Sequence, residues 1–486
     1  MIAHERTRFR WVFCQLETLR QCLPQSVLRT LNELPESLDD TYERLMTNIT
    51  RANQAHAYRM LQCLTVAIRP LTVAELAELL AFDFDVAEGE MPKLKPNWRW
   101  EDHEQAILST CSSLVTVVPN GRSPVVQFSH FSVKEFLMSD RLATSRRDIS
   151  RYHISLEDAH TLLTRASLAV LLRDPDVNTH SDSAPLAEYA AEYWVTHAQV
   201  KNIASRVRDG IQCLFDPDKP YFEAWVGLYD IDLYEYSLDP PDPEPGARPL
   251  YYAALGGFHE QVEHLTLRYP QSAKARGGLR GTALHSASSE GHLRVVQYLL
   301  RLGVDVNVRN TENYTSLQFA SWKGHCDVVQ CLLDHDADLE LQDKWHHSPL
   351  SFAVFFGRVD AIRLLLEHNA DVNSQDVDGR TPLHHTIESN HFIAERPQVV
   401  RLLLKHGANA NARDESRQTP LHLAAVQSDL LDVLRILLEH GADLDAEDKY
   451  GKTPLQLSLE EGHHEVTRLL SEYATTKPTS QVVISV

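Results

Sequence analysis

Histidine offers the most chemistry in this sequence, because imidazole binds metals and transfers protons. The 486 residues include 25 histidines, and three pairs of them are adjacent: His346-His347, His384-His385 and His463-His464. None of these pairs has a cysteine or carboxylate partner in the ligand pattern of a zinc site. The sequence therefore predicts no metal site and no cofactor.

Many histidines instead recur at fixed places in a longer pattern. One group occupies the fourth position of a Thr-x-Leu-His-like opening, where imidazole can hydrogen-bond to the backbone of a neighbouring loop. A second group ends apolar helical segments, where positive charge suits the helix dipole. The two groups are His285, His384 and His422, and then His335, His368, His406 and His440. We expect both groups to be structural.

The sequence contains no recognisable catalytic arrangement. It has neither a Gly-x-Ser-x-Gly elbow nor a His-Glu-x-x-His helix, so nothing nominates a nucleophile or a general base. A trace of a phosphate-binding loop occurs at Gly451-Lys452-Thr453, but Ala446 stands where that loop needs glycine and Pro454 interrupts the helix that should follow. We predict no enzyme activity.

These residues are positioned by a repeat that a leucine marks. Leu284 recurs at intervals of 33 residues as Leu317, Leu350 and Leu383, and then at intervals of 38 and 34 residues as Leu421 and Leu455. A period of this length is typical of a solenoid of helix pairs. Threonine and proline ahead of the leucine start the first helix, and a glycine seven residues after it ends that helix in copies such as Gly291 and Gly324.

The openings Thr381-Pro382-Leu383-His384 and Thr419-Pro420-Leu421-His422 make this region resemble the ankyrin-repeat family. The resemblance implies a solenoid that binds other proteins through a groove. An earlier copy starts at Pro249-Leu250, so we expect about seven repeats over residues 247–473. The fifth has about five extra residues near Asn390–Pro397, which should lengthen the connection between its helices.

In ankyrin repeats the loop tips and the end of each first helix face the groove, and in the middle repeats these positions are aromatic. They are Tyr314 and Trp345 at the tips, with Trp322, Phe355 and Phe356 near the turns. We expect Trp322 and Trp345 to be the most exposed partner-binding residues, whereas packing between neighbouring repeats explains Phe355 and Phe356 equally well. The expected polar rim consists of His346, Arg380, Arg417 and Tyr450.

The N-terminal part predicts helices followed by a hairpin. Ser37 and the capping box Thr72–Glu75 open helices, and residues 114–118 and 125–128 alternate as two strands around Asn120-Gly121. A further helix starts at Phe131. This order predicts a winged-helix-like module. Its expected recognition helix, near Ala74–Leu80, has two glutamates and no Lys or Arg, which disfavours phosphate contacts.

Several N-terminal motifs resemble the region that follows the NTPase domain in fungal NACHT–ankyrin proteins of the STAND class. They are Phe9–Leu16, Leu34–Tyr42, Arg69–Thr72, His130–Leu137 and Tyr189–Trp194. The resemblance implies that an NTPase precedes this region and that the repeats act as a sensor. Here Met1 stands only about ten residues before the first motif, which leaves no room for that domain. A stand-alone adaptor and a gene model without its 5′ exons both remain open.

Composition limits the classes of partner and compartment. A formal net charge of −20 disfavours direct binding of nucleic acid or an anionic membrane. Seven scattered cysteines without a CxxC pair, and the lack of a signal peptide or an 18-residue apolar run, indicate an intracellular protein of the cytoplasm or nucleus.

The expected architecture is mainly α: a helical and winged-helix-like module, then an ankyrin solenoid. The expected boundaries are 1–150 for the module, 151–238 for a helical region, 239–246 for a Pro/acidic linker, 247–473 for the repeats and 474–486 for a flexible tail. The leading hypothesis is a non-catalytic adaptor or sensor that binds a protein through the repeats. The alternatives are a coregulator that binds a transcription factor, and a truncated NACHT–ankyrin signalling NTPase.

Overall fold

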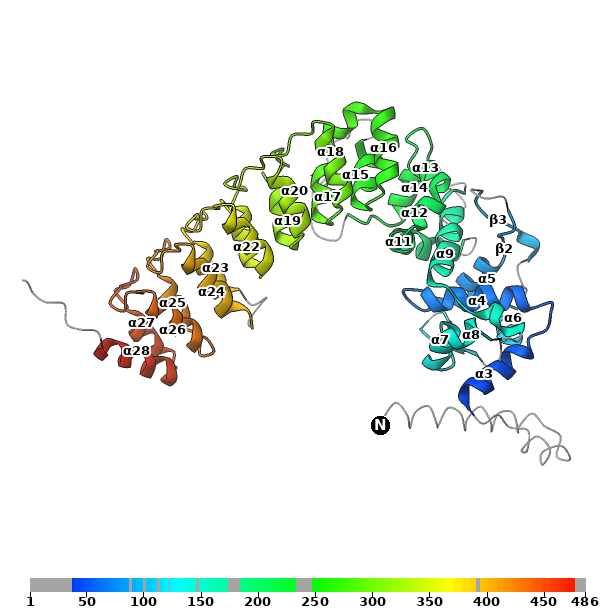
Figure 1. Ribbon diagram of the computed structural model, residues 1–486, viewed down its shortest axis with the longest axis horizontal. Coiled ribbons are helices and arrows are strands. Elements are labelled where there is room, and N and C mark those ends of the chain that lie inside the picture. Colours follow the sequence, from blue (N-terminus) through cyan, green and yellow to red (C-terminus); the bar gives the residue numbers. More distant parts are fainter. Residues whose placement is uncertain are drawn as a thin grey trace, which may run out of the picture. The chain divides into compact units, whose positions relative to one another are not determined.

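The computed structural model of the protein describes residues 37–86, 90–98, 102–111, 114–121, 123–145, 148–173, 184–232, 247–389 and 394–476. The chain divides into two compact units, Met1–Tyr236 and Ser237–Val486. Helices dominate both units (Figure 1), so the predicted mainly α fold is confirmed. The expected linker 239–246, the motif Phe9–Leu16 and all but the first three residues of the expected tail lie outside the described residues.

The first part of the N-terminal unit combines short helices with a three-stranded sheet. In chain order its elements are α3 (Leu38–Thr47), α4 (Gln54–Val66), β1 (Leu71–Thr72), α5 (Val73–Leu80), β2 (Phe82–Asp83), β3 (Lys93–Leu94), the 3-10 helix Pro96–Trp98, α6 (His103–Cys111), β4 (Val115–Val118), β5 (Val125–Phe128), α7 (Phe131–Leu137) and α8 (Asp140–Ala143). The antiparallel sheet has the order β1-β5-β4, with Val126 paired to Leu71 on one side and Val117 on the other. This is the predicted winged-helix arrangement.

Local sequence accounts for the boundaries of these elements. The Ser37 side chain accepts from the Asp40 N–H at the start of α3, and Thr72 and Glu75 form the predicted capping box of α5. Gly121 turns the β4–β5 hairpin with a φ of +56°, a conformation that suits glycine.

The structure corrects the expected recognition helix. The helix directly before the hairpin is α6, not α5, and α6 also contains a glutamate and no Lys or Arg. The two glutamates of α5 are buried. Glu75 binds Arg69, whereas Glu78 accepts from Arg173 and from the Leu186 N–H, at 2.8 Å each. The Glu78 carboxylate therefore joins the winged helix to the helices that follow.

The second part of the N-terminal unit is helical and has an aromatic core. Its elements are the 3-10 helix Asp148–Tyr152, α9 (Leu156–Leu171), α11 (Ala187–Ala198), α12 (Ile203–Arg206), α13 (Arg208–Leu214) and α14 (Tyr221–Leu228). The rings of Trp194 and Trp225 lie 5.3 Å apart, and Phe215 and Phe222 lie within 5.9 Å of Trp225. The Trp225 indole N–H donates to the Ala191 carbonyl (3.0 Å), so the core contains no unsatisfied polar group at this residue.

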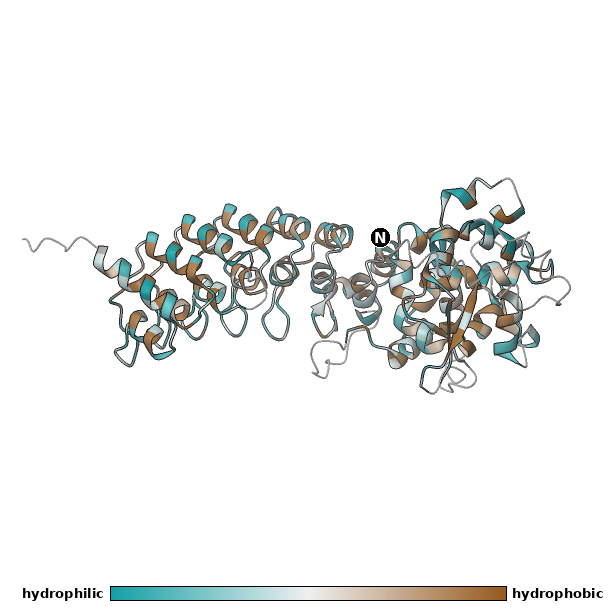
Figure 2. Ribbon diagram, turned by 90° about the horizontal axis from the view of Figure 1, so that it is seen from below, coloured by the Kyte–Doolittle hydropathy of each residue, from teal (hydrophilic) through white to brown (hydrophobic). Residues whose placement is uncertain are grey.

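The C-terminal unit contains seven helix pairs in its described residues, in agreement with the expected number of repeats. They are α15 (Ala247–Leu255) with α16 (His259–Arg268), α17 (Ala283–Ser289) with α18 (Leu293–Arg301), α19 (Ser316–Lys323) with α20 (Cys326–Leu333), α21 (Pro349–Phe355) with α22 (Val359–Glu367), α23 (Pro382–Glu388) with α24 (Arg396–Lys405), α25 (Pro420–Ala425) with α26 (Leu431–Glu439), and α27 (Pro454–Glu460) with α28 (His464–Thr476). The 3-10 helix Pro270–Lys274 and the short strands β6 (Arg276–Gly278) and β7 (Gly281–Thr282) connect the first two pairs. Figure 2 shows both hydrophobic and hydrophilic residues on the helices of these pairs, as their stacking requires.

The pattern histidines and threonines start the first helices as predicted. In α17, α23 and α25 a capping box joins the threonine to the histidine three residues later. The other imidazole nitrogen binds the next loop: His384 Nε2 lies 3.2 Å from the Gln418 carbonyl, and His422 Nε2 lies 3.2 Å from the Lys452 carbonyl. Each of these histidines therefore holds two successive repeats together.

Asparagine side chains also join successive loops. Asn373 Nδ2 donates to the Gly407 carbonyl (3.1 Å), and its Oδ1 accepts from the Asn409 N–H (2.8 Å). The same two bonds are made by Asn307 to Asp336 and Asp338, and by Asn411 to Gly441 and Asp443. We call this series of contacts the asparagine ladder. Between the third and fourth repeats Glu340 takes the place of asparagine, and its carboxylate accepts from the Asp371 N–H.

We predict that Asn373→Ala lowers the free energy of unfolding of the repeat unit by about 1 kcal/mol, because two solvent-exposed hydrogen bonds are lost. Glu340→Ala, which removes a single such bond, should cost less. Urea unfolding of both variants measures the difference. An equal or smaller effect for Asn373→Ala would contradict the role assigned to the ladder.

Candidate functional site

The aromatic residues expected in the groove form one cluster over the third and fourth repeats. Tyr314, in the loop before α19, lies 6.1 Å from Trp345, in the loop before α21, between ring centroids. Phe352 of α21 lies 5.5 Å from Tyr314 and 6.2 Å from Trp322. Rings at these separations attract each other, so the cluster is preformed.

Exposure within the cluster differs from the expectation. Trp322 is half-buried, because it stacks on Phe356 at 5.1 Å with an angle of 26° between the rings. Trp345 and Phe355 are the exposed members, at 40% and 41% of their full surface. Packing between repeats therefore explains Phe356, whereas Phe355 points outward.

Two further cluster residues, one exposed in part and one buried, follow from a signal that the sequence analysis did not use. Phe319 and Phe352 both stand two residues after a repeat leucine, and Phe319 stacks on Trp322 at 6.3 Å. Phe352 is half-buried and Phe319 is buried. We define the aromatic surface as the cluster residues that retain exposure: Tyr314, Trp322, Trp345, Phe352, Phe355 and Phe356.

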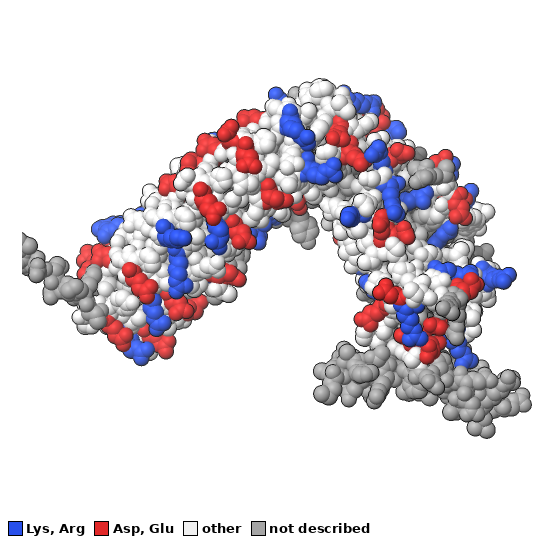
Figure 3. Space-filling view, in the orientation of Figure 1, with Lys and Arg blue, Asp and Glu red and all other residues white. Residues whose placement is uncertain are grey.

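Lysines flank the two tryptophans of the aromatic surface. Lys323 Nζ lies 5.0 Å from the ring centroid of Trp322, and Lys344 Nζ lies 4.3 Å from that of Trp345. Cations at this distance are attracted by the ring quadrupole. On the face shown in Figure 3, positive and negative side chains are interspersed over the repeats.

The expected polar rim is only partly next to this surface. His346 is exposed beside Trp345 with a φ of +64°, and the Arg380 guanidinium lies 3.6 Å from Glu388. Arg417 and Tyr450 occupy the tips of the next two loops, and Tyr450 is 74% exposed. Among the described residues, the ring contacts of the cluster extend to His385 and include neither of these two tips.

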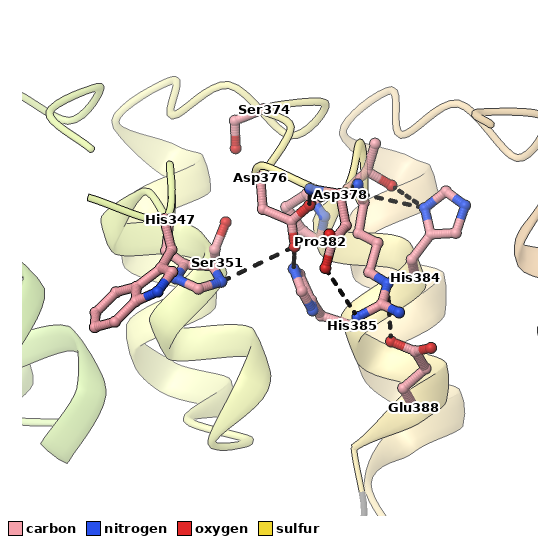
Figure 4. A network of polar contacts seen from close by, with 12 residues as sticks. His347, Ser351, Ser374, Asp376, Asp378, Pro382, His384, His385 and Glu388 are labelled. Atoms are coloured by element: carbon pink, nitrogen blue, oxygen red, sulfur yellow. Dashed lines mark hydrogen bonds and ion pairs between the residues drawn. The ribbon is translucent and has the colours of Figure 1, made fainter. Parts of the chain in front are cut away.

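A second group of side chains lies at the edge of the aromatic surface (Figure 4). The Asp376 carboxylate points toward His347 and His385, with Oδ2 3.9 Å from His347 Nε2 and 3.1 Å from His385 Nε2. Burial alone would raise the pKa of Asp376. Hydrogen bonds from His385 and from the backbone of Arg380 outweigh that effect, so its pKa lies below the usual value.

The sequence analysis missed this group, because its members come from a loop tip, the next loop and a first helix. The adjacent pairs His346-His347 and His384-His385 each separate on folding: one histidine of each pair enters the group and the other does not. His346 is exposed, and His384 caps its own helix. The ligand pattern therefore arises between repeats and not within a short segment.

The geometry and the family comparisons together define the class of protein. The profile of the ankyrin repeats matches residues 250–343, 332–414 and 393–481, and that of the GPI inositol-deacylase winged helix domain matches residues 42–147. This is an ankyrin-repeat protein with an N-terminal winged-helix domain. Ankyrin repeats support a role in protein interaction. Among the described residues no helix is both long and apolar enough to span a membrane.

Two fungal relatives are similar to parts of the chain. The azaphilone pigments biosynthesis cluster protein L of Monascus ruber is 32% identical over 298 residues, which are 57% of this chain and 61% of that protein. The vegetative incompatibility protein HET-E-1 of Podospora anserina is 24% identical over 221 residues, 40% of this chain and 15% of that protein. The chain thus spans less than two thirds of either relative. The predicted resemblance to fungal NACHT–ankyrin proteins is confirmed at this level.

Among solved structures, the ankyrin repeat domain of Bcl-3 is 28% identical and covers 46% of this chain and 97% of its own, with a TM-score of 0.41.

Proposed function

We propose that the protein is a non-catalytic adaptor that binds another protein through the aromatic surface. The observation that carries this proposal is the exposure of Trp345 and Phe355 on a stack of rings that is already assembled. Exposed apolar patches of this kind typically mark interaction sites. The mechanism is burial of a preformed surface, which costs little ordering of side chains on binding.

The two exposed rings differ from scattered surface hydrophobic residues because other aromatic rings pack against them. Phe355 lies 5.1 Å from Phe356, which stacks on Trp322, and Trp345 lies 6.1 Å from Tyr314. Trp345 is thus backed by a ring of the preceding repeat, and Phe355 by a ring of its own repeat that stacks on the preceding one. Aromatic anchors with such support are the residues that dominate binding energies at protein interfaces.

The test begins with partners isolated from the source organism on the full chain and identified by quantitative mass spectrometry. Affinities of purified partners are then measured. We expect Trp345→Ala to weaken binding by about 2 kcal/mol, or roughly 30-fold. Leu459→Ala is the matched control, since Leu459 is 59% exposed in α27 and lies outside the aromatic surface. Partners whose affinities are unchanged by both Trp345→Ala and Phe355→Ala would contradict the site.

A second candidate function is that of a coregulator, in which the partner is a transcription factor. The name of the Monascus ruber relative, a pigments biosynthesis cluster protein, favours a role beside a biosynthetic gene cluster. The absence of Lys and Arg from α6 favours contact with DNA through the partner alone. Chromatin association that is lost on deletion of residues 247–473 would support this candidate, and exclusion from the nucleus would oppose it.

A third candidate is a sensor that belongs to an NTP-driven signalling protein. The similarity to HET-E-1, which covers 15% of that protein, favours it. Sequencing of the native full-length transcript distinguishes it from the other two, because an in-frame Walker A motif upstream would supply the NTPase.

A further inference from the structure

Three side chains from the fourth and fifth repeats converge on one point beside the aromatic surface. One ligand atom each from His347, Asp376 and His385 lies within 4.8 Å of the other two. The Asp376 and His385 side chains are 4% and 6% exposed, whereas that of His347 is 31% exposed. Figure 4 shows the Asp376 carboxylate between the two imidazoles.

The two oxygens of the Asp376 carboxylate make different contacts. Oδ1 accepts from the backbone N–H groups of Asp378 (2.9 Å) and Arg380 (2.8 Å), and these bonds shape the loop. Oδ2 is directed at the two histidines. His385 Nε2 is buried and lies 3.1 Å from Oδ2. A buried imidazole nitrogen thus points into the group and faces the carboxylate oxygen.

His347 is oriented by a second carboxylate. Its Nδ1 lies 3.2 Å from Asp343 Oδ2, which leaves Nε2 turned toward Asp376. Asp343 is buried, and its Oδ1 accepts from the Trp345 and His347 backbone N–H groups, so the orienting carboxylate is itself fixed. A carboxylate that binds one imidazole nitrogen while the other faces the metal is the usual outer support of a histidine ligand.

The repeat architecture does not require these histidines. His385 stands two residues after the repeat leucine, where neighbouring repeats carry Phe319, Phe352 and Leu423. His347 stands four residues after the loop aspartate, where the next repeats carry Arg380, Gln418 and Lys452. The fold therefore accepts apolar residues at the position of His385 and other polar residues at that of His347. The presence of histidine at both positions, beside a carboxylate, is particular to the junction of the fourth and fifth repeats.

We propose that His347 Nε2, Asp376 Oδ2 and His385 Nε2 bind a divalent metal ion of the zinc type, with solvent in the remaining position, and that the ion joins the fourth and fifth repeats. Two imidazoles and a carboxylate suit such an ion. Tetrahedral zinc needs ligand atoms about 3.3 Å apart. The Asp376–His385 distance is close to that value, and the more exposed His347 has to move inward. This proposal stands independently of the partner-binding role.

The test uses the full chain freed of metal by a chelator. Zn²⁺ binding is measured by calorimetry, and Co²⁺ binding by its visible absorption, which is intense only in tetrahedral sites. Trp345, whose ring lies 6.5 Å from that of His347, should lose fluorescence as Co²⁺ binds. The expected result is one saturable site with the cobalt spectrum of mixed nitrogen and oxygen ligands.

The chain itself suggests variants that keep the fold. Asp376→Asn retains the oxygen that shapes the loop, as Asn310 does in an earlier repeat by accepting from the Glu312 and Tyr314 N–H groups. His385→Phe and His347→Gln place at these positions residues found in other repeats. Each should weaken Zn²⁺ binding by about 100-fold, and Asp343→Asn by about 10-fold.

His346→Asn is the control for the other histidines. It is adjacent to a proposed ligand, keeps a residue suited to positive φ as at Asn313, and should leave the affinity unchanged. The proposal is overturned if the wild-type chain shows no saturable site, or if its Zn²⁺ affinity is the same in Asp376→Asn, His385→Phe and His347→Gln. Circular dichroism of each variant confirms that a lost site does not reflect a lost fold.

Discussion

Trp225→Ala is expected to lower the free energy of unfolding of the N-terminal unit by about 4 kcal/mol, the usual cost of emptying a buried aromatic site. Trp225 is 1% exposed and contacts the rings of Trp194, Phe215 and Phe222. The change also removes the indole donor from the Ala191 carbonyl. Because α11, α13 and α14 meet at this ring, the loss should affect the whole helical part of the unit.

Chemical denaturation followed by tryptophan fluorescence and circular dichroism measures this effect. Trp98→Ala is the matched control: Trp98 belongs to the same unit but is 41% exposed, and its loss should cost less than about 0.5 kcal/mol. Comparable costs for the two variants would contradict the assignment of Trp225 to the core.

The repeat unit should lose stability as the pH falls from 6.5 to 4, and His285 should account for part of that loss. Burial lowers the pKa of His285 from 6.5 to about 4, against a smaller opposite effect of the Tyr314 and Val308 carbonyls. The neutral ring accepts from the Thr282 N–H at Nδ1 and faces those carbonyls with Nε2. Folding therefore favours the unprotonated ring.

The direction of this pH dependence follows from proton binding in the folded and unfolded chain. Between pH 6.5 and 4 the unfolded chain binds a proton at this residue and the folded chain does not, so stability is complete above pH 6.5 and decreases as the pH falls toward 4. The lowering of the His285 pKa from 6.5 to about 4 corresponds to a loss of about 3 kcal/mol in the free energy of unfolding once the pH has fallen below both values.

His285→Gln should remove this contribution and keep the fold. Gln318, at the same position of the next repeat, makes equivalent hydrogen bonds. Its Oε1 accepts from the Thr315 N–H, and its Nε2 donates to the Leu341 and His347 carbonyls. Urea unfolding between pH 4.5 and 7 should give a flatter pH dependence for the variant than for the wild type. His406→Gln, at an exposed residue, should leave the dependence unchanged. An identical slope for wild type and His285→Gln would refute the proposed linkage.

The repeats were predictable because their local signals are redundant. Leucine spacing, threonine caps and glycine turns all indicate the same helix pairs, and the capping boxes at Thr381 and Thr419 form as expected. The β4–β5 hairpin was predictable from two alternating segments around Asn120-Gly121. In each case the interaction lies within a few residues of the signal that predicts it.

What the sequence concealed depends on contacts between distant segments. Glu78 belongs to the expected recognition helix, but it is buried against Arg173, almost a hundred positions later in the chain. The sequence predicted an exposed Trp322, but rings from the next repeat pack against it. The His347, Asp376 and His385 group combines three segments, and no local pattern reports on the distance between them.

The asparagine ladder bears on how such an array can change length over evolutionary time. Asn373 and Asn411 end their repeats in the same way, each with one bond to a glycine carbonyl and one to a backbone N–H of the next loop. Excision of residues 374–411 would bring Asn373 to the place of Asn411. Its side chain would then meet the Gly441 carbonyl and the Asp443 N–H, the same kinds of acceptor and donor that it binds now. Whole repeats can therefore be lost or duplicated without inventing a new junction, whereas the junction at Glu340 has no such interchangeable counterpart.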